Sequence, residues 1–307
     1  MRIFIMIHKY FRTQTLLLLL LPMLLGGCGL AKLSRIQKES DLVVVETTLA
    51  KNLKTLERLA KTGNTGLIVK TARAHSSYSG FLEDKMEDAE LAGNTETADE
   101  MRSQAIAHYV RSEAYAFKAL AKSDKTFKEP RTVDLETFKA ALQKLEKKQV
   151  EPLFWAAYAM GRGISLQKDD PMQVIDLARV ELMMGRVLEL DETFYFGSAH
   201  LFYAVYYGDR SPSIGGDPEK AKEHIDIVDK MNDGKFLMSK FYLARYYAYP
   251  KQDLKLYKQA LQEVIDAPQD IYPGEAAATS LAKSRAKRWL AQADMLFDPE
   301  LEEGGSE

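Results

Sequence analysis

Cysteine is nearly absent from this chain: a single residue, Cys28, occurs among 307. One thiol cannot form an internal disulfide, and it cannot build a cysteine-based metal site by itself. After the first 27 residues, no apolar run approaches the roughly 20 residues that a membrane-spanning helix needs. The fold must therefore be stabilised by packing, without cross-links and without a bundle of spanning helices.

Signatures of catalysis are missing as well. The sequence has no Gly-x-Ser-x-Gly motif and no His-Glu-x-x-His motif, and it offers no cysteine nucleophile. After residue 27 its four histidines are scattered; we expect His200 and His224 to lie on paired helices and to approach each other, but a metal site needs more ligands than two. We predict that the protein is not an enzyme and has no cofactor and no metal.

The residues before Cys28 have the three-part layout of a secretory signal. Basic residues begin the chain, an apolar run spans residues 16–25, and Gly26 and Gly27 precede the cysteine. Leu25-Gly26-Gly27-Cys28 resembles the bacterial lipobox, in which cleavage precedes a cysteine that is then acylated. The alternative is an uncleaved anchor helix with an incidental cysteine. We predict a lipoprotein signal peptide over residues 1–27 and a lipidated tether over 28–40.

Several acyl chains on Cys28 would hold the protein stably at a membrane, since one chain alone binds only marginally. Gly29 follows the cysteine, and by resemblance to Gram-negative lipoproteins a residue other than aspartate there favours the outer membrane. Removing residues 1–27 takes away three positive charges and no negative one, so the net charge goes from −2 to −5. This mildly acidic balance argues against a nucleic-acid partner.

Helical periodicity runs through the remaining chain, whereas alternating strand patterns are nearly absent. Leu42, Leu49, Leu53, Leu56 and Ala60 recur at the spacing of one helix face. Glycine-asparagine pairs at residues 63–64 and 93–94 predict the ends of the first two helices. We predict a single all-α domain over residues 41–297, followed by an acidic, disordered tail over 298–307.

Short helices separated by regular breaks suggest an internal repeat. Val187, Val228 and Val264 occupy matching places in three segments, with spacings of 41 and 36 residues. A tetratricopeptide repeat has about 34 residues. The sequence therefore predicts an array of helical hairpins with degenerate tetratricopeptide-like repeats that carry insertions.

The clearest insertion, "YYGDRSPSIGGDPEKAKEHI" from Tyr206, resembles the T component of tripartite ATP-independent periplasmic (TRAP) transporters, the TatT-like lipoproteins. Four further stretches agree with that family in the same order: "YSGFLEDKMEDAE", "HYVRSEAYAFKAL", "FWAAYAMGRGISLQKDD" and "AKSRAKRWLAQADMLF". The resemblance implies a helical, tetratricopeptide-like lipoprotein. It also implies a trimer with a pore through each subunit and association with a periplasmic solute-binding protein.

Within the insertion, a phosphate-binding loop is disfavoured because Asp217 follows the two glycines where lysine would be needed. The structural interpretation is that Gly215 and Gly216 form a turn, Asp217 caps the next helix and Pro218 is its first residue. The alternative interpretation is that Arg210, or the loop as a whole, contacts a partner.

Aromatic residues concentrate in two segments. Residues 194–207 hold seven and residues 236–249 hold six of the 30 in the chain. Ordinary packing of helical hairpins explains such rings, because tyrosine suits half-buried surfaces. The functional hypothesis is that some of them line a passage for an amphipathic solute, with an arginine that pairs with a carboxylate. The alternative is that this arginine, Arg245, faces water and has no role in binding. The residues in this hypothesis are Tyr203, Tyr207, Tyr242, Tyr246 and Arg245.

Two functions follow from these patterns. The first is a lipid-anchored accessory component of a TRAP-type transport system that faces the periplasm and associates with a solute-binding protein. The second is a tetratricopeptide-like scaffold for assembly of an envelope complex, without passage of a solute. The sequence does not name the solute.

Overall fold

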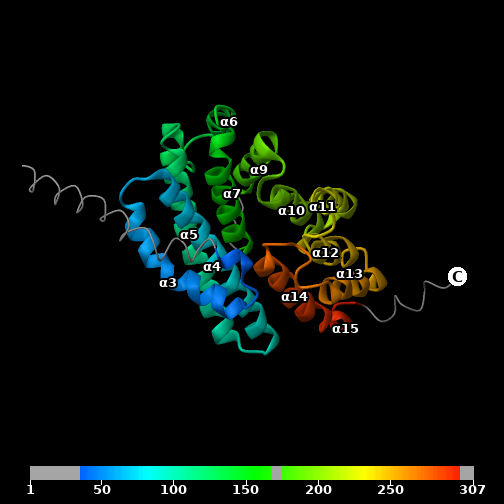
Figure 1. Cartoon of the computed structure of the whole chain (residues 1–307). Helices are drawn as coiled ribbons and strands as arrows, with labels where there is room; N and C mark the ends of the chain where they lie inside the picture. Colours follow the sequence, from blue (N-terminus) through cyan, green and yellow to red (C-terminus); the bar gives the residue numbers. More distant parts are fainter. Residues whose placement is uncertain (1–34, 168–174, 298–307) are drawn as a thin grey trace, which may run out of the picture.

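The computed structural model describes residues 35–167 and 175–297, and every regular element in these stretches is helical (Figure 1). The all-α class predicted from the sequence is confirmed. The predicted signal peptide, Cys28, most of the predicted tether and the predicted tail over 298–307 lie outside the described residues. No helix within the described ranges combines the length and the apolarity needed to cross a membrane.

Three long helices begin the fold, after a single 3-10 turn, η1 (Ile36–Lys38). They are α3 (Leu42–Ala60), α4 (Thr65–Leu91) and α5 (Thr95–Leu120). Asn64 and Asn94 cap α4 and α5, each accepting a hydrogen bond from the backbone N–H three residues later. The predicted stripe of α3 is buried at Leu49, Leu53, Leu56 and Ala60, with Val45 in place of Leu42.

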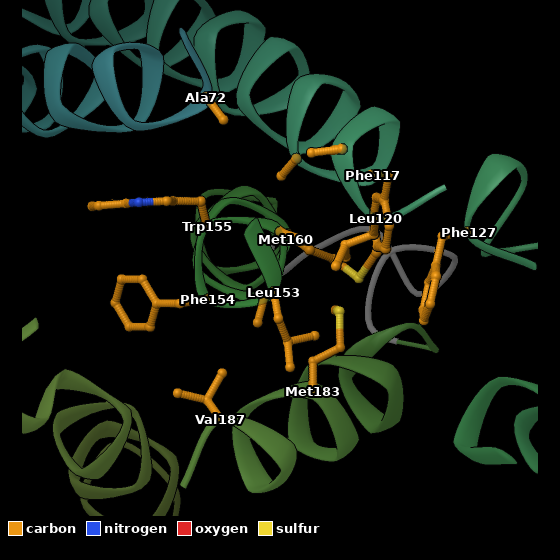
Figure 2. Packing of buried hydrophobic residues seen from close by; sticks show 14 of the residues in the cluster. Ala72, Phe117, Leu120, Phe127, Leu153, Phe154, Trp155, Met160, Met183 and Val187 are labelled. Atoms are coloured by element: carbon orange, nitrogen blue, oxygen red, sulfur yellow. The ribbon is translucent and has the colours of Figure 1, made fainter. Parts of the chain in front are cut away.

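The first hydrophobic core surrounds α7 (Val150–Ser165), as Figure 2 shows. Phe117 and Leu120 reach it from α5, and Met183 and Val187 reach it from α9 (Leu177–Asp191). A short helix, α6 (Leu135–Gln143), closes one side, with the 3-10 turns η2 (Lys125–Lys128) and η3 (Lys147–Gln149) on either side of it along the chain. Because α7 is apolar on nearly all sides, it can only be stable inside the fold.

The second core is built from shorter helices. They are α10 (Phe194–Gly208), α11 (Pro218–Met231), α12 (Met238–Leu243), α13 (Leu254–Asp266), α14 (Ala276–Leu290) and α15 (Ala293–Leu296). A 3-10 turn, η4 (Pro212–Ile214), lies between α10 and α11, and α12 continues into a π-helical turn, η5 (Ala244–Ala248). Tyr257, Leu261 and Val264 of α13 are fully buried in this core.

The array closes on itself, because arginine side chains of α14 bind carboxylates of α4. Arg285 Nε and Nη2 donate to the two carboxylate oxygens of Asp84 at 2.9 and 3.1 Å. Arg288 donates to Asp84, Glu87 and Asp88 at 2.9, 3.0 and 2.6 Å. Residues 201 positions apart in the chain thus hold its two halves together.

The predicted repeat stays a prediction. Val187, Val228 and Val264 are all fully buried, in α9, α11 and α13. A repeat would place them this way, but burial in two different cores does not establish one register.

Candidate functional site

A cavity of about 990 Å³ lies inside the closed array, and residues of both cores line it. Its walls come from α3, α4, α7, α9, α10, α12 and α14. Such a volume is at the upper end of the range for small-molecule sites, which are typically apolar with a few polar groups. The aromatic lining residues are Phe81, Phe154, Trp155, Tyr158, Tyr195, Phe196, Phe202, Tyr206, Phe236 and Tyr242.

Part of the wall is a continuous set of ring contacts. Trp155 meets Phe154 and Tyr195 edge to face, with ring centroids 5.0 and 5.1 Å apart. Phe196 stacks on Phe236 at 4.6 Å with an interplanar angle of 20°. These are favourable geometries for aromatic pairs. The rings therefore join the first core to the second across one face of the cavity.

The backbone of α10 is irregular where it carries these rings. Tyr195 and Phe196 have φ of 48° and 64°, and Gly197 continues the left-handed turn at 73°. Each non-glycine residue in this region costs about 1–2 kcal/mol. Asn232 Nδ2 donates to the carbonyl oxygen of Phe196 at 3.1 Å and helps to hold the turn. Strained backbone of this kind is concentrated at ligand-binding sites in proteins.

Two arginine-carboxylate pairs form a polar part of the wall. Arg162 of α7 contacts both oxygens of Glu83 through Nε and Nη2, and Tyr109 also donates to Glu83. Arg285 of α14 contacts both oxygens of Asp84 in the same way. Arg162 and Arg285 line the cavity, with their carboxylate partners on α4.

Electrostatics keep these pairs ionised. Burial alone would lower the pKa of Arg162, but the carboxylate of Glu83 outweighs it and holds that pKa above its usual range. Burial would likewise raise the pKa of Asp84, but Arg285 and Arg288 reverse the effect and hold it below its usual range. The wall therefore contains fixed charges at any pH near neutrality.

Comparison with protein families gives a direct result. The model of one family, described as TRAP transporter T-component, matches residues 38–297, which is nearly all of the chain. The chain belongs to the TRAP transporter T-component family. No curated protein matched it in a separate comparison.

In this T-component, the five residues predicted to border one cavity are separated. Tyr242 lines the cavity. Tyr203 and Tyr207 instead stack on His224 of α11, at 5.1 and 6.0 Å between ring centroids. Arg245 lies over the ring of Trp289, and Tyr246 contacts Tyr242 at 5.0 Å. The cavity takes other members of the same two aromatic segments, among them Phe202, Tyr206 and Phe236.

The physical reason is helix phase. Tyr203 and Tyr207 are four residues apart and share a face, which α11 covers, whereas Phe202 and Tyr206 lie about 100° around the helix and face inward. On the second segment, the π-helical turn shifts the register after Leu243 and sends Arg245 toward α14.

The loop after α10 has the geometry of a turn and a helix cap. Gly215 has φ of 90°, and a Cβ on Gly216 would overlap the carbonyl oxygen of Arg210. Asp217 accepts from Lys220 N at 3.2 Å, and Pro218 is the first residue of α11. Arg210 folds back over the ring of Tyr206 at 3.7 Å and lines the cavity. The loop therefore belongs to one mouth of the cavity.

Two histidine pairs have nearly the same geometry in the two halves. His75 and His108 join α4 to α5, and His200 and His224 join α10 to α11, each with Nδ1 atoms 2.8 Å apart. Among the described residues, no group of three or more potential ligands is placed to hold a metal ion. The pairs are helix contacts: one imidazole donates its proton to the other.

The ion pairs between α4 and α14 were not predicted from the sequence. Besides Asp84, Glu87 and Asp88 of α4 bind Arg288. A signal was present, because acidic residues spaced along α4 match basic residues spaced along α14. Recognising it required knowing that the two ends of the array meet.

Proposed function

We propose that this T-component is a lipid-anchored, periplasm-facing accessory of a TRAP-type transport system. In this role its cavity holds a solute on the way to or from a solute-binding protein. The observation that supports it most is the largely apolar cavity of about 990 Å³ within a chain of this family. The lining is suited to a solute because aromatic rings bury apolar groups and the arginines orient a polar end.

The alternative, a scaffold for envelope assembly, requires only outer surfaces of the helical array. It gives no reason for strained backbone at Tyr195 and Phe196 beside an internal space.

Partner association tests the transport role. The T-component and the TRAP-type solute-binding protein of the same organism are mixed, and binding is measured by titration calorimetry and by co-elution. We expect a saturable complex. Absence of any complex at high micromolar concentrations of both proteins, with and without medium-derived solutes, would remove the transport role and favour the scaffold.

Anchoring is tested on the full chain. Replacing Cys28 with alanine is expected to abolish both processing and acylation, so that the protein no longer partitions into the outer-membrane fraction. Unchanged processing and fractionation of the Cys28→Ala protein would disprove the lipoprotein assignment.

The oligomeric state is proposed from the family alone, as a trimer. Light scattering on the chain without residues 1–28 measures it directly. A mass of one chain at high micromolar concentration would contradict the trimer and would leave the cavity, which lies within one chain, unaffected.

A further inference from the structure

Within the fully described helix α3, the outward face carries no acidic residue. Its exposed positions recur at intervals of three and four residues after two adjacent valines, and all of them lie within about 100° of the helix circumference. The buried residues Leu53 and Leu56 point to the opposite side and pack with Ala74 of α4. The exposed residues, called the outer stripe below, are Val43, Val44, Thr47, Lys51, Lys54 and Arg58.

The charges of α3 are divided between its flank and its outward face. On the flank, Glu46 pairs with Lys85 of α4, and a carboxylate oxygen of Glu57 lies 3.2 Å from Nε2 of His75. In contrast, no ion pair in the described part of the chain involves a cation of the outer stripe. The outer stripe therefore presents three unpaired positive charges, although the net charge of the whole chain is −2.

Stability of the helix does not explain the outer stripe. Arg58 lies in the last turn, where a cation interacts favourably with the helix dipole, but Lys51 and Lys54 lie in the middle of the helix, beyond the reach of that effect. Val43 and Val44 are 70% and 46% exposed, and β-branched side chains lower helix propensity. Exposed apolar residues followed by cations on one helix face are typical of a helix that lies in a membrane interface.

The position of α3 in the chain places the outer stripe beside the proposed lipid anchor. Cys28 precedes residue 35, where the described chain begins, by seven positions, and seven residues span at most about 25 Å. Two further cations, Arg35 and Lys38, are exposed between that point and α3. Clusters of basic residues beside a membrane anchor, or on an amphipathic helix, attract anionic lipids. The anchor therefore keeps a cationic helix face within reach of the membrane surface.

We propose that α3 lies along the membrane, with its outer stripe in the headgroup region of an anionic phospholipid bilayer. Val43 and Val44 reach the boundary with the acyl chains, and the three cations of the stripe contact lipid phosphates. This contact orients the protein, whereas the acyl chains on the anchor attach it stably. Since Ile36 and Gln37, just before α3, line the cavity, the orientation holds that part of the cavity wall near the membrane. This inference rests on the proposed function, because it requires the lipid anchor.

Depth in the bilayer is measured on the full acylated protein, reconstituted into vesicles of phosphatidylcholine with or without phosphatidylglycerol. A nitroxide label is attached at Thr47→Cys in the outer stripe and, as the matched control, at Ser103→Cys, an exposed position of α5. Acylation of Cys28 leaves no other thiol to label. On anionic vesicles, we expect collisions with a water-soluble nickel chelate to be at least about fivefold rarer at residue 47 than at residue 103, because the headgroup region excludes the chelate.

Charge variants test the electrostatic part of the contact. Lys51→Gln/Lys54→Gln should weaken the contact about twentyfold or more, since each cation near an anionic surface accounts for a factor of about five, and the label at residue 47 then returns to water. Lys139→Gln/Lys255→Gln is the matched control, because it removes the same charge from exposed positions on α6 and α13. We expect the label to stay protected from the chelate in the control.

Serine variants test the apolar part. Val43→Ser/Val44→Ser should make the label at residue 47 shallower, so that collisions with the chelate become more frequent and collisions with membrane-dissolved oxygen become rarer. Val110→Ser is the control, because Val110 is an exposed valine of α5, outside the outer stripe. All of the substituted positions are exposed, so we expect the helical circular dichroism of every variant to match that of the wild type.

Equal chelate collisions at residues 47 and 103 on anionic vesicles would overturn the proposal, as would equal protection on neutral vesicles or in the Lys51→Gln/Lys54→Gln protein. Protection that appears only after addition of the solute-binding protein would also overturn it and would make the outer stripe a protein interface. An anchored protein with a water-exposed label loses this inference and keeps the lipid anchor. Failure of acylation at Cys28 would remove the anchor and this inference together.

Discussion

The two halves of this protein reach stability by different means. In the first, α4 and α5 run for 27 and 26 residues, and the core around α7 contains fully buried rings such as Phe127, Phe138 and Phe154. In the second, α11 and α13 have 14 and 13 residues. The second half also contains a left-handed turn at Tyr195 and Phe196 and a π-helical turn at Ala244–Ala248.

This contrast indicates that the two halves have different roles at the cavity. Regular helices with a dense core give a rigid wall, whereas left-handed and π-helical turns cost stability and recur at functional positions. Both irregular turns flank residues of the cavity, Tyr195 and Phe196 in one case and Tyr242 in the other. The first half can therefore be regarded as the frame and the second as the adaptable wall.

Core truncations should show the difference most strongly. Phe138→Ala leaves a void between the ring of Phe127 and the guanidinium of Arg179, and we expect it to lower the free energy of unfolding by about 3–5 kcal/mol. Phe236→Ala opens onto an existing cavity, and we expect less than half of that loss. Denaturant unfolding measures both. Equal losses would contradict the division into frame and adaptable wall.

Breaking the link between the halves should come next. Asp84→Asn leaves Arg285 and Arg288 without their shared carboxylate, with an expected cost of about 3 kcal/mol. Glu90→Gln is the control, because its pair with Arg102 is exposed and contributes at most about 1 kcal/mol. Since the pKa of Asp84 is lowered in the folded state, its contribution is present above about pH 4 and is lost as the pH falls toward the folded pKa. A loss no larger than that of Glu90→Gln would show that the halves do not depend on this link.

The histidine pairs offer a comparison at matched geometry. Burial lowers the pKa of His75 to about 3 and of His108 to about 4, with Arg111 adding to both, and it lowers the pKa of His224 to about 4, with His200 adding. A lowered histidine pKa gives stability that is present above the unfolded value of 6.5 and is lost as the pH falls toward the folded value.

We therefore expect unfolding to become easier between about pH 6.5 and pH 4. The double variant His75→Gln/His108→Gln should flatten this dependence by about 1 kcal/mol between pH 7 and pH 5, after allowance for solvent screening of the half-exposed His108. Thermal unfolding across this range gives the measurement. The counterpart variant, His200→Gln/His224→Gln, should flatten the pH dependence less, because no arginine adds to the lowering of the His224 pKa. An unchanged pH dependence in the first variant would refute the role of the pair.

The smallest effect is expected at a helix cap. Asp217→Ala removes the hydrogen bond to Lys220 N and should cost about 1 kcal/mol, as should Asn64→Ala at the start of α4. Calorimetric melting of the two variants compares the halves at their surfaces. A loss of stability at Asp217 well above that at Asn64 would contradict this expectation. It would mean that the loop between α10 and α11 contributes more to the stability of the second half than a helix cap does.

The sequence predicted the parts of this fold that depend on local chemistry. Helix breaks at residues 63–64 and 93–94 coincide with the ends of α3 and α4, because glycine and asparagine stop and cap helices wherever they stand. The break between α14 and α15, after Leu290 and before Ala293, contains no glycine or proline that would predict it.

Residues of the site were harder to predict, since their roles depend on distant contacts. Arg162 and Arg285 acquire theirs only when α7 and α14 both meet α4. The two aromatic segments can be found by counting aromatic residues along the chain. Which face of each segment points into the cavity depends on packing against α11 and on the π-helical turn, which the count does not predict. Of the five residues in the hypothesis, Tyr242 lines the cavity, whereas Tyr203 and Tyr207 stack on His224.

Blocking the cavity tests the transport account most directly. Ser77→Trp/Ala277→Trp fills the cavity from α4 and α14, and Leu91→Trp/Ser284→Trp places two tryptophans at exposed positions on the same helices. Solutes removed from the medium by cells are quantified by mass spectrometry for the wild type, a deletion strain and both variants. We predict that the cavity variant, once shown to be folded and membrane-bound, loses the same solutes as the deletion strain while the control variant matches the wild type. Wild-type solute removal by the cavity variant would contradict the account.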